Sequence, residues 1–170
     1  MASETEVKPI AVDTNVFLHL LNRQEDPDSH IDHLLIHLAR EGYVLCVDSL
    51  GKISAEYQEK IEPALKDASD MGIARILLSH WMKGERIQVT IDLQGALISA
   101  VKEVIPERNE TVDRLFVAVS CTQPCALVTN DDTHILSRKR ELRRKTRKWH
   151  KGELEIMNSR EAREHFVSAG

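Results

Sequence analysis

Four acidic residues that lie far apart in the chain could together bind a divalent cation. They are Asp13 in IAVDTNVFLHLL, Glu56 in ISAEYQEKI, Asp113 in TVDRLFVAVS and Asp131 in ALVTNDDTHIL. Carboxylates that gather within a few ångströms repel one another unless a positive charge lies between them. Their hard oxygen atoms favour Mg²⁺ or Mn²⁺ over zinc. Such ions can activate a water for attack on a phosphodiester, so these residue types suggest phosphodiester hydrolysis.

Two of the acids follow short apolar runs that are typical of buried parallel strands. Asp13 follows residues 10–12, Asp131 follows residues 126–129 and Asn130, and a helix-like pattern comes after each acid. In an open α/β sheet the ligand site lies beyond the carboxyl ends of the strands. We therefore expect Asp13 and Asp131 to project into the same crevice.

Strand-like and helix-like segments alternate along the rest of the chain. Further strands are predicted at 43–47, 86–90 and 153–157, and helices at 30–40, 50–61, 63–83, 93–104, from 109 or 111 onward, and 159–166. This alternation predicts a single α/β domain over residues 1–170, a three-layer α/β/α sandwich with a central, mostly parallel, twisted sheet. Residues 1–8 are expected to form a flexible N-terminus.

Asp113 is notable because its helix is apolar nearly all round, which predicts a buried central helix. The N-terminus of that helix would favour the negative charge by about 0.3–1 kcal/mol. This offsets only part of the several kcal/mol that burying an unpaired ion costs. A bound cation would complete the compensation. Pairing with Arg108 or Arg114, or an exposed helix start, is an equally open alternative.

The other acids also have structural alternatives. Asp13 and Asp131 could simply cap the helices that follow them. In the doubled acid we favour Asp132 as the helix N-cap and Asp131 as the ligand. Glu56 shares its predicted helix with Glu59, so a solvated acidic face competes with a ligand role, and either glutamate could be the acid of this segment.

The ordered set of motifs resembles the PIN-domain nucleases, including the toxin components of bacterial and archaeal toxin–antitoxin pairs. The motifs are D-T-N at 13–15, S-A-E-Y at 54–57, D-R-L-F-V-A-V at 113–119 and V-T-N-D at 128–131. The resemblance covers residues 10–136, and 154–166 resembles the usual ending of the family. It implies a single PIN-like domain that binds Mg²⁺ or Mn²⁺ through the four acids and cleaves RNA, usually single-stranded, as an endonuclease.

The resemblance also implies supporting roles and partners. Asn15 would orient the first acid, and Thr129, Asn130 and Asp132 would stand around the metal ligands. An antitoxin protein and a second copy of the chain are implied as partners. The chain departs from the family pattern at Ser120 and at Thr133-His134, which replace a small apolar residue and an aromatic ending. His134 could meet a substrate phosphate.

A basic segment at 138–151 predicts contact with nucleic acid. It contains nine Lys and Arg against one acid, a charge of +8; because the whole chain carries −4, the remainder carries −12. Clustered cations neutralise phosphates better than a diffuse positive surface does. The residues expected to bind nucleic acid are Arg138, Arg140, Arg143, Arg144, Arg147 and Lys148. The open alternative is a solvated helix or loop that balances the acidic body, and the segment is a longer insert than a compact toxin requires.

Composition bounds the remaining choices. The chain has no signal peptide and no run approaching roughly 18 apolar residues, so we predict a cytoplasmic protein without a membrane partner. The three cysteines are expected to be reduced thiols. His30, His33 and His37 could cluster on one helix face, and the i, i+4 spacing of His33 and His37 can hold zinc, but no matching third ligand is evident in the sequence. Partly exposed structural histidines are therefore favoured.

Three hypotheses of function follow. The leading one is a metal-dependent endoribonuclease that hydrolyses phosphodiester bonds of single-stranded RNA, in which Asp13, Asp113 and Asp131 are the main ligands and Glu56 supports them. The alternative is a catalytically weak or inactive PIN-fold module that binds RNA or regulates. A phosphoryl-accepting receiver-like domain is a third, but the chain offers no convincing lysine after a late strand.

Overall fold

The computed structural model describes residues 6–22, 30–150 and 153–168. Within these residues five strands form one sheet, in the order β3-β2-β1-β4-β5, and every neighbouring pair is parallel. The strands are β1 (Lys8–Val12), β2 (Tyr43–Asp48), β3 (Arg86–Val89), β4 (Ala126–Val128) and β5 (Ile156–Met157). The predicted α/β class and parallel sheet are confirmed, and β5 is shorter than the predicted strand at 153–157.

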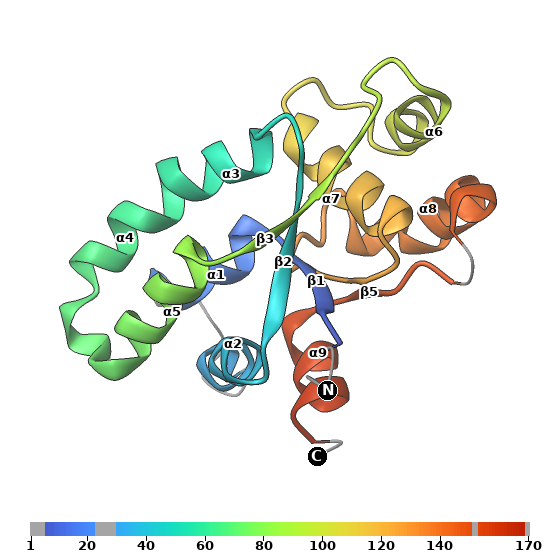
Figure 1. Cartoon of the computed structure of the whole chain (residues 1–170). Helices are drawn as coiled ribbons and strands as arrows, with labels where there is room; N and C mark the ends of the chain where they lie inside the picture. Colours follow the sequence, from blue (N-terminus) through green and yellow to red (C-terminus); the bar gives the residue numbers. More distant parts are fainter. Residues whose placement is uncertain (1–5, 23–29, 151–152, 169–170) are drawn as a thin grey trace, which may run out of the picture.

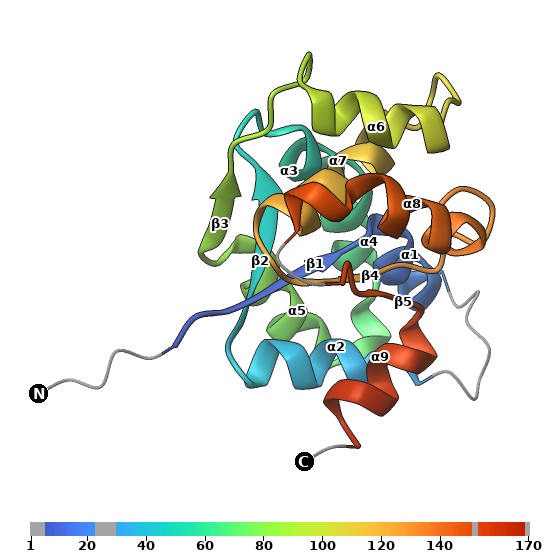
Figure 2. The ribbon, with the colours of Figure 1, turned by 90° about the vertical axis from the view of Figure 1, so that its right-hand side faces the viewer.

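Helices cover both faces of this sheet, as a parallel sheet requires because its apolar strands are buried on both sides. The helices are α1 (Thr14–Leu21), α2 (Ile31–Arg40), α3 (Lys52–Glu56), α4 (Glu62–Asp67), α5 (Ile73–Lys83), α6 (Ala96–Val104), α7 (Thr111–Thr122), α8 (Lys139–Thr146) and α9 (Ser159–Phe166). Figure 2 shows α6, α7 and α8 on one side of the sheet and α2, α5 and α9 on the other. The α3, α4 and α5 segments extend away from the sheet as an arm (Figure 1).

The order of the strands creates a switch point at the centre of the sheet. The chain moves from β1 outward to β2 and β3, then returns to place β4 on the other side of β1. Connections between parallel strands are right-handed, so the direction of winding decides which face each helix covers. In α/β sheets the point where the direction reverses is where ligands bind, in the crevice beyond the carboxyl ends of the strands, and here that point lies between β1 and β4.

The buried helix α7 lies against the sheet beside that crevice. Its residues from Leu115 to Cys121 have no exposed surface, and α7 contacts β1, β2 and β4. The strand residues Ile10, Ala11 and Val12 are equally buried. The prediction of a buried central helix that carries Asp113 is therefore confirmed.

The predicted continuous helix at 63–83 is wrong. One π turn, Tyr57–Ile61, joins α3 to α4, so the helix runs through Pro63 and ends at Asp67 instead. A wide turn before the proline accommodates a residue that cannot donate to the preceding turn. The break spans residues 68–72. A short 3-10 turn, Ser69–Met71, follows α4, and Gly72, whose positive φ of 55° favours glycine, stands directly before α5.

The N-terminal prediction is corrected in one respect. Lys8 belongs to β1 and pairs in register with Tyr43, so it is part of the sheet. Residues 1–5, which were expected to be flexible, lie outside the described residues. No helix within the described ranges combines the length and the apolar character needed to cross a membrane. The cysteines are free thiols, of which Cys46 and Cys121 are buried.

Candidate metal centre

The switch point brings the first and fourth acidic segments together. Val12 of β1 is in register with Val128 of β4, and the backbone N–H of Asp13 donates to the Val128 carbonyl over 2.9 Å. Asp13 and Thr129 therefore leave the sheet side by side, and the Thr129 hydroxyl donates to Asp13 Oδ2 over 2.7 Å. The predicted convergence of two strand ends is confirmed at this position.

Asp13 is almost completely buried, with 2% of its surface exposed. Burial raises its pKa from 3.8 to about 6, and the hydrogen bonds from Thr129 and from the Asn15 backbone only partly oppose that rise. The negative charges of Asp131 and Glu56 raise it further. The same side chain is the N-cap of α1. Its ionised form is stabilised by two donors but lacks a full counter-charge, which is the state that a nearby cation would relieve.

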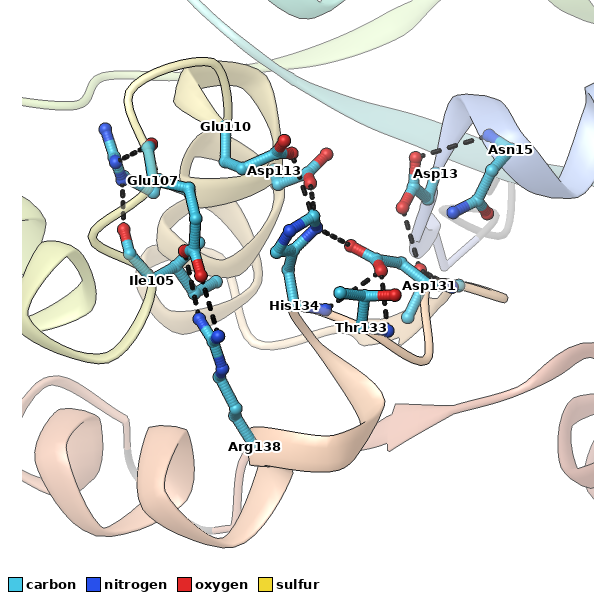
Figure 3. A network of polar contacts seen from close by, with 12 residues as sticks. Asp13, Asn15, Ile105, Glu107, Glu110, Asp113, Asp131, Thr133, His134 and Arg138 are labelled. Atoms are coloured by element: carbon cyan, nitrogen blue, oxygen red, sulfur yellow. Dashed lines mark hydrogen bonds and ion pairs between the residues drawn. The ribbon is translucent and has the colours of Figure 1, made fainter.

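Asp131 both faces the crevice and caps the turn that follows it. Its Oδ1 accepts from the backbone N–H groups of Thr133 and His134, each over 3.0 Å, and its own N–H donates to the Thr129 hydroxyl. The expectation that Asp132 would be the cap is wrong, because Asp132 is exposed and Asp131 fulfils that role. The second oxygen of Asp131, Oδ2, is directed toward the His134 ring, 3.3 Å from Nδ1 (Figure 3).

The first turn of α7 supplies the next two carboxylates. Asp113 is partly buried, and the pKa of its carboxyl is raised to about 9, chiefly by burial. A hydrogen bond with Glu110 and the negative charges of Asp13 and Asp131 add to this rise. Arg114 does not neutralise Asp113, because its guanidinium donates to the carbonyls of Ile105 and Glu107. The alternative of an Asp113–Arg114 pair is thus wrong.

His134 lies at the centre of these acids. Its Nδ1 is 3.3 Å from Asp131 Oδ2, 3.6 Å from Glu110 Oε2 and 4.0 Å from Asp113 Oδ2. Figure 3 shows the imidazole between α7 and the loop that carries Asp131. A protonated His134 would supply positive charge to three carboxylates, and a neutral one would offer a nitrogen ligand.

The donor set fits a metal ion. One ligand atom from each of Glu110, Asp113, Asp131 and His134 lies within 4.8 Å of all the others, so the four residues could hold one cation. Three carboxylates suit hard divalent ions, while an imidazole nitrogen suits transition metals. Binding would displace the proton that the raised pKa of Asp113 retains, because a carboxylate must be ionised to act as a ligand.

Asp13, Glu56 and Asn15 were also predicted to belong to the site, and none of them is among the four residues of this group. Glu56 is close enough to raise the pKa of Asp13, but its carboxylate pairs with Lys60 over 3.5 Å. The side chain of Asn15 accepts from the backbone N–H of Asn130 over 3.0 Å and so joins the two strand ends. Asn130 in turn accepts from the Ser159 N–H at the start of α9. Both asparagines therefore support the site instead of lining it.

An ion pair fixes the loop before α7 to the segment after His134. Both oxygens of Glu107 accept from Arg138, over 2.7 and 3.0 Å, and Arg138 also donates to the Val104 carbonyl. Such a two-pronged pair is directional as well as attractive. Glu110 lies three residues after Glu107 and His134 four before Arg138. The pair consequently sets how closely His134 approaches α7, and its guanidinium is already engaged within the protein.

Replacing Arg138 by methionine should lower the affinity for Mn²⁺ by about 10- to 100-fold, because groups that orient ligands have effects of this size. The free energy of unfolding should fall only slightly, since both partners are partly exposed. Calorimetric titration with Mn²⁺ measures the first quantity and urea denaturation the second. Lys145→Met, which removes the ion pair between Lys145 of α8 and Glu103 of α6, is the control. Equal Mn²⁺ affinities in the two variants would contradict a positioning role.

Glu110 and, in part, His134 are the members of the group that sequence reasoning missed. Glu110 is three residues before Asp113, and residues at that spacing meet on one face of a helix, so a helix start at Thr111 gave a usable signal. His134 was noted only as a phosphate contact. Its position among three carboxylates depends on the turn that Asp131 caps, which no periodicity indicates.

The chain matches no protein-family model, no curated protein and no solved structure.

Proposed function

We propose that this chain is a metal-dependent endoribonuclease with a PIN-like fold that cleaves single-stranded RNA. The observation that carries the proposal is the convergence of Asp13, Asp113 and Asp131 at the switch point of a parallel sheet. Asp113 and Asp131 form with Glu110 and His134 a group that could hold a cation, and the negative charge of Asp13, outside that group, raises the pKa of Asp113. Sites at such switch points are where α/β sheets bind ligands, and grouped carboxylates are typical of phosphodiester hydrolysis by divalent ions.

We propose Mn²⁺ as the preferred ion and Mg²⁺ as its substitute. Carboxylates accept both, whereas an imidazole nitrogen is a better ligand for a transition metal than for Mg²⁺. When bound, the ion would supply Lewis acidity at the scissile phosphate. Within the chain, Asp113, Asp131, Glu110 and His134 would hold it.

The remaining residues support this centre. Thr129 orients Asp13 by donating to one of its oxygens, and the backbone of Asn15 holds the other. Asp13 would then present a fixed negative charge beside the ion. Glu56 would contribute charge at longer range while it pairs with Lys60. The toxin role, the antitoxin partner and the homodimer stay predictions from the resemblance.

The proposal is tested by incubating a labelled single-stranded RNA with the purified chain in Mn²⁺, in Mg²⁺ and with a chelator. Internal cleavage should appear with either ion, be faster with Mn²⁺, and disappear on chelation. A duplex of the same sequence should be cut more slowly. Cleavage that persists in the chelator would contradict the metal-dependent mechanism.

The alternative function, an RNA-binding module without turnover, is supported by a specific observation. The acidic group can neutralise itself, because Asp113 and Glu110 share a hydrogen bond and His134 lies between the acids. A centre that is satisfied by protons does not require an ion for its stability. RNA binding by α8 without cleavage under any divalent ion would favour this alternative.

The RNA contacts of α8 give a separate prediction. Arg143 donates to the Leu154 carbonyl and pairs with Glu153, so it, like Arg138, has partners within the protein. Arg144 pairs with Glu141 at an exposed position. Arg140 of α8, and Arg147 and Lys148 in the 3-10 turn directly after it, are exposed and are the better candidates for phosphate contacts.

Replacing Arg140, Arg147 and Lys148 together by glutamine should weaken binding of single-stranded RNA and reduce its salt dependence. The slope of log affinity against log salt should fall by about 2, since each phosphate contact on a single strand contributes about 0.7. Fluorescence anisotropy at several salt concentrations measures the slope. A control triple, with Arg40, Lys66 and Lys83 changed to glutamine, removes the same charge from exposed positions on α2, α4 and α5. An identical slope in both triples would show that α8 does not contact RNA.

A further inference from the structure

A second group of metal-ligating side chains lies at the start of α2. His30, Asp32 and His33 each offer one ligand atom, and these atoms all lie within 4.8 Å of one another. None of the three takes part in the acidic centre. Helix α2 lies on the opposite side of the sheet from α7, which carries Asp113 (Figure 2). The group therefore needs its own explanation.

The backbone at His30 has an uncommon conformation that brings the two histidines together. His30 precedes α2 with φ 48° and ψ 47°, and it is the only non-glycine residue with positive φ in the described part of the chain. A left-handed conformation is unfavourable for a residue with a side chain. In this conformation the His30 ring stacks on the His33 ring, with centroids 5.1 Å apart and planes 11° from parallel. Strained residues of this kind often occur where a ligand is held.

Asp32 supplies the ligand that the sequence did not reveal. Its Oδ2 is 3.7 Å from His33 Nε2, and the His33 and Asp32 side chains are 60% and 43% exposed. The spacing had pointed to His37 as the companion of His33, but the structure gathers His30, Asp32 and His33. Exposure leaves room for water to fill further coordination positions, and the carboxylate provides negative charge for a cation at a helix start, where the helix dipole is unfavourable.

We propose that His30, Asp32 and His33 bind one first-row transition metal ion of the Zn²⁺ or Ni²⁺ type. Two imidazoles and one carboxylate suit these ions, whereas Mg²⁺ and Ca²⁺ prefer sites made of oxygen alone. The bound ion joins the residue before α2 to its first turn. Since the unfolded chain does not preform this arrangement, binding stabilises the folded protein by mass action.

The test is calorimetric titration of Zn²⁺ into the full chain without an affinity tag, in excess Mg²⁺, with His30→Ala, His33→Ala and Asp32→Asn as variants. We expect His30→Ala or His33→Ala to weaken one equivalent of Zn²⁺ binding by about 10-fold or more, because a ligand matters at least as much as the groups behind it. Asp32→Asn keeps both imidazoles and should weaken the same equivalent. His37→Ala, one turn further along α2, is the matched control and should bind like the parent.

A second readout separates loss of a ligand from loss of the fold. Zn²⁺ should raise the melting temperature of the parent and of His37→Ala more than that of His33→Ala, while all variants melt alike in a chelator. Because the acidic centre is unchanged in every variant, the difference from the parent reports α2 alone. Unaltered Zn²⁺ binding in His30→Ala and His33→Ala, or an equal loss in His37→Ala, would overturn the assignment. The outcome does not depend on whether the chain cleaves RNA.

Discussion

Asp113→Asn should reduce metal-dependent RNA cleavage by more than about 100-fold while leaving the metal-free protein as stable as the parent. The first effect is expected because Asp113 would ligate the ion directly, and even the groups that merely orient ligands contribute 10- to 100-fold to affinity or activity. The second effect follows from the protonation state. The pKa of Asp113 is raised to about 9, so at neutral pH without metal the side chain is an uncharged acid. Asparagine closely matches that acid in size and charge.

The two effects are measured on the same sample. Cleavage of single-stranded RNA in Mn²⁺ gives the activity, and urea denaturation in a chelator gives the free energy of unfolding. Mn²⁺ should also raise the melting temperature of the parent but hardly that of Asp113→Asn. Glu164→Gln, which removes one exposed negative charge on α9, is the matched control and should cleave like the parent. Cleavage by Asp113→Asn at the rate of the parent would contradict the proposed metal centre.

The metal-free protein should lose stability as pH rises from about 4 to 9, and divalent ions should restore it. The cause lies in two upward shifts: the pKa of Asp13 rises to about 6 and that of Asp113 to about 9, from 3.8 for each when unperturbed. The folded protein therefore holds protons that the unfolded chain releases. Their stabilising effect is complete below about pH 4 and is lost as pH passes through 6 for Asp13 and through 9 for Asp113.

The expected size is large for Asp13, which is fully buried. A shift of about two units corresponds to about 3 kcal/mol lost by neutral pH. Glu107 acts in the opposite direction, because Arg138 holds its pKa at about 2. The stability that Glu107 provides is present above pH 4.5 and is lost as pH falls toward 2. The stability of the metal-free protein should consequently be greatest at mildly acidic pH.

Urea denaturation between pH 4 and 9, with a chelator and with Mn²⁺, tests this expectation. In the chelator the free energy of unfolding should decline across the range, and in Mn²⁺ the decline should be much smaller, because the ion replaces the protons. Asp113→Asn should flatten the upper part of the curve, between pH 6 and 9. A curve that rises with pH in the chelator would show that these carboxyls are not held in their protonated forms.

The class of the fold and most of its helices and strands could be predicted from local sequence patterns. Apolar runs such as Ile10–Val12 report burial on both faces directly, because every residue of a central parallel strand is covered. The apolar residues on nearly all sides of the helix that carries Asp113 predicted its burial in the same way. The acids at the ends of β1 and β4 could be placed at one edge because the carboxyl ends of parallel strands meet there.

Periodicity did not locate the end of the helix at 63–83. We predicted a helix start at Pro63 because proline is common in the first turn of a helix. In the structure one π turn, Tyr57–Ile61, precedes it, and the helix continues through Pro63. The helical segments are separated before Ile73, where Gly72 has a positive φ that cannot be read from the sequence. The proline and the glycine were both plausible helix boundaries from local sequence, and only the folded structure shows which of them separates two helices.

Which side chains share the candidate centre could not be predicted from the sequence and depends on the tertiary fold. His134 lies among the acids because Asp131 accepts from the His134 backbone N–H and so caps the turn between the two residues. Arg138, which follows that turn, is fixed to Glu107 by an ion pair. Glu56 is excluded from the closest group although its segment resembles a known motif, and Asp32 replaces His37 beside the histidines of α2. Burial and the positions of the strands follow from local patterns of apolar residues. A ligand set depends on angles and contacts between segments that can lie more than a hundred residues apart, as Asp13 and Thr129 do, and no local pattern records these.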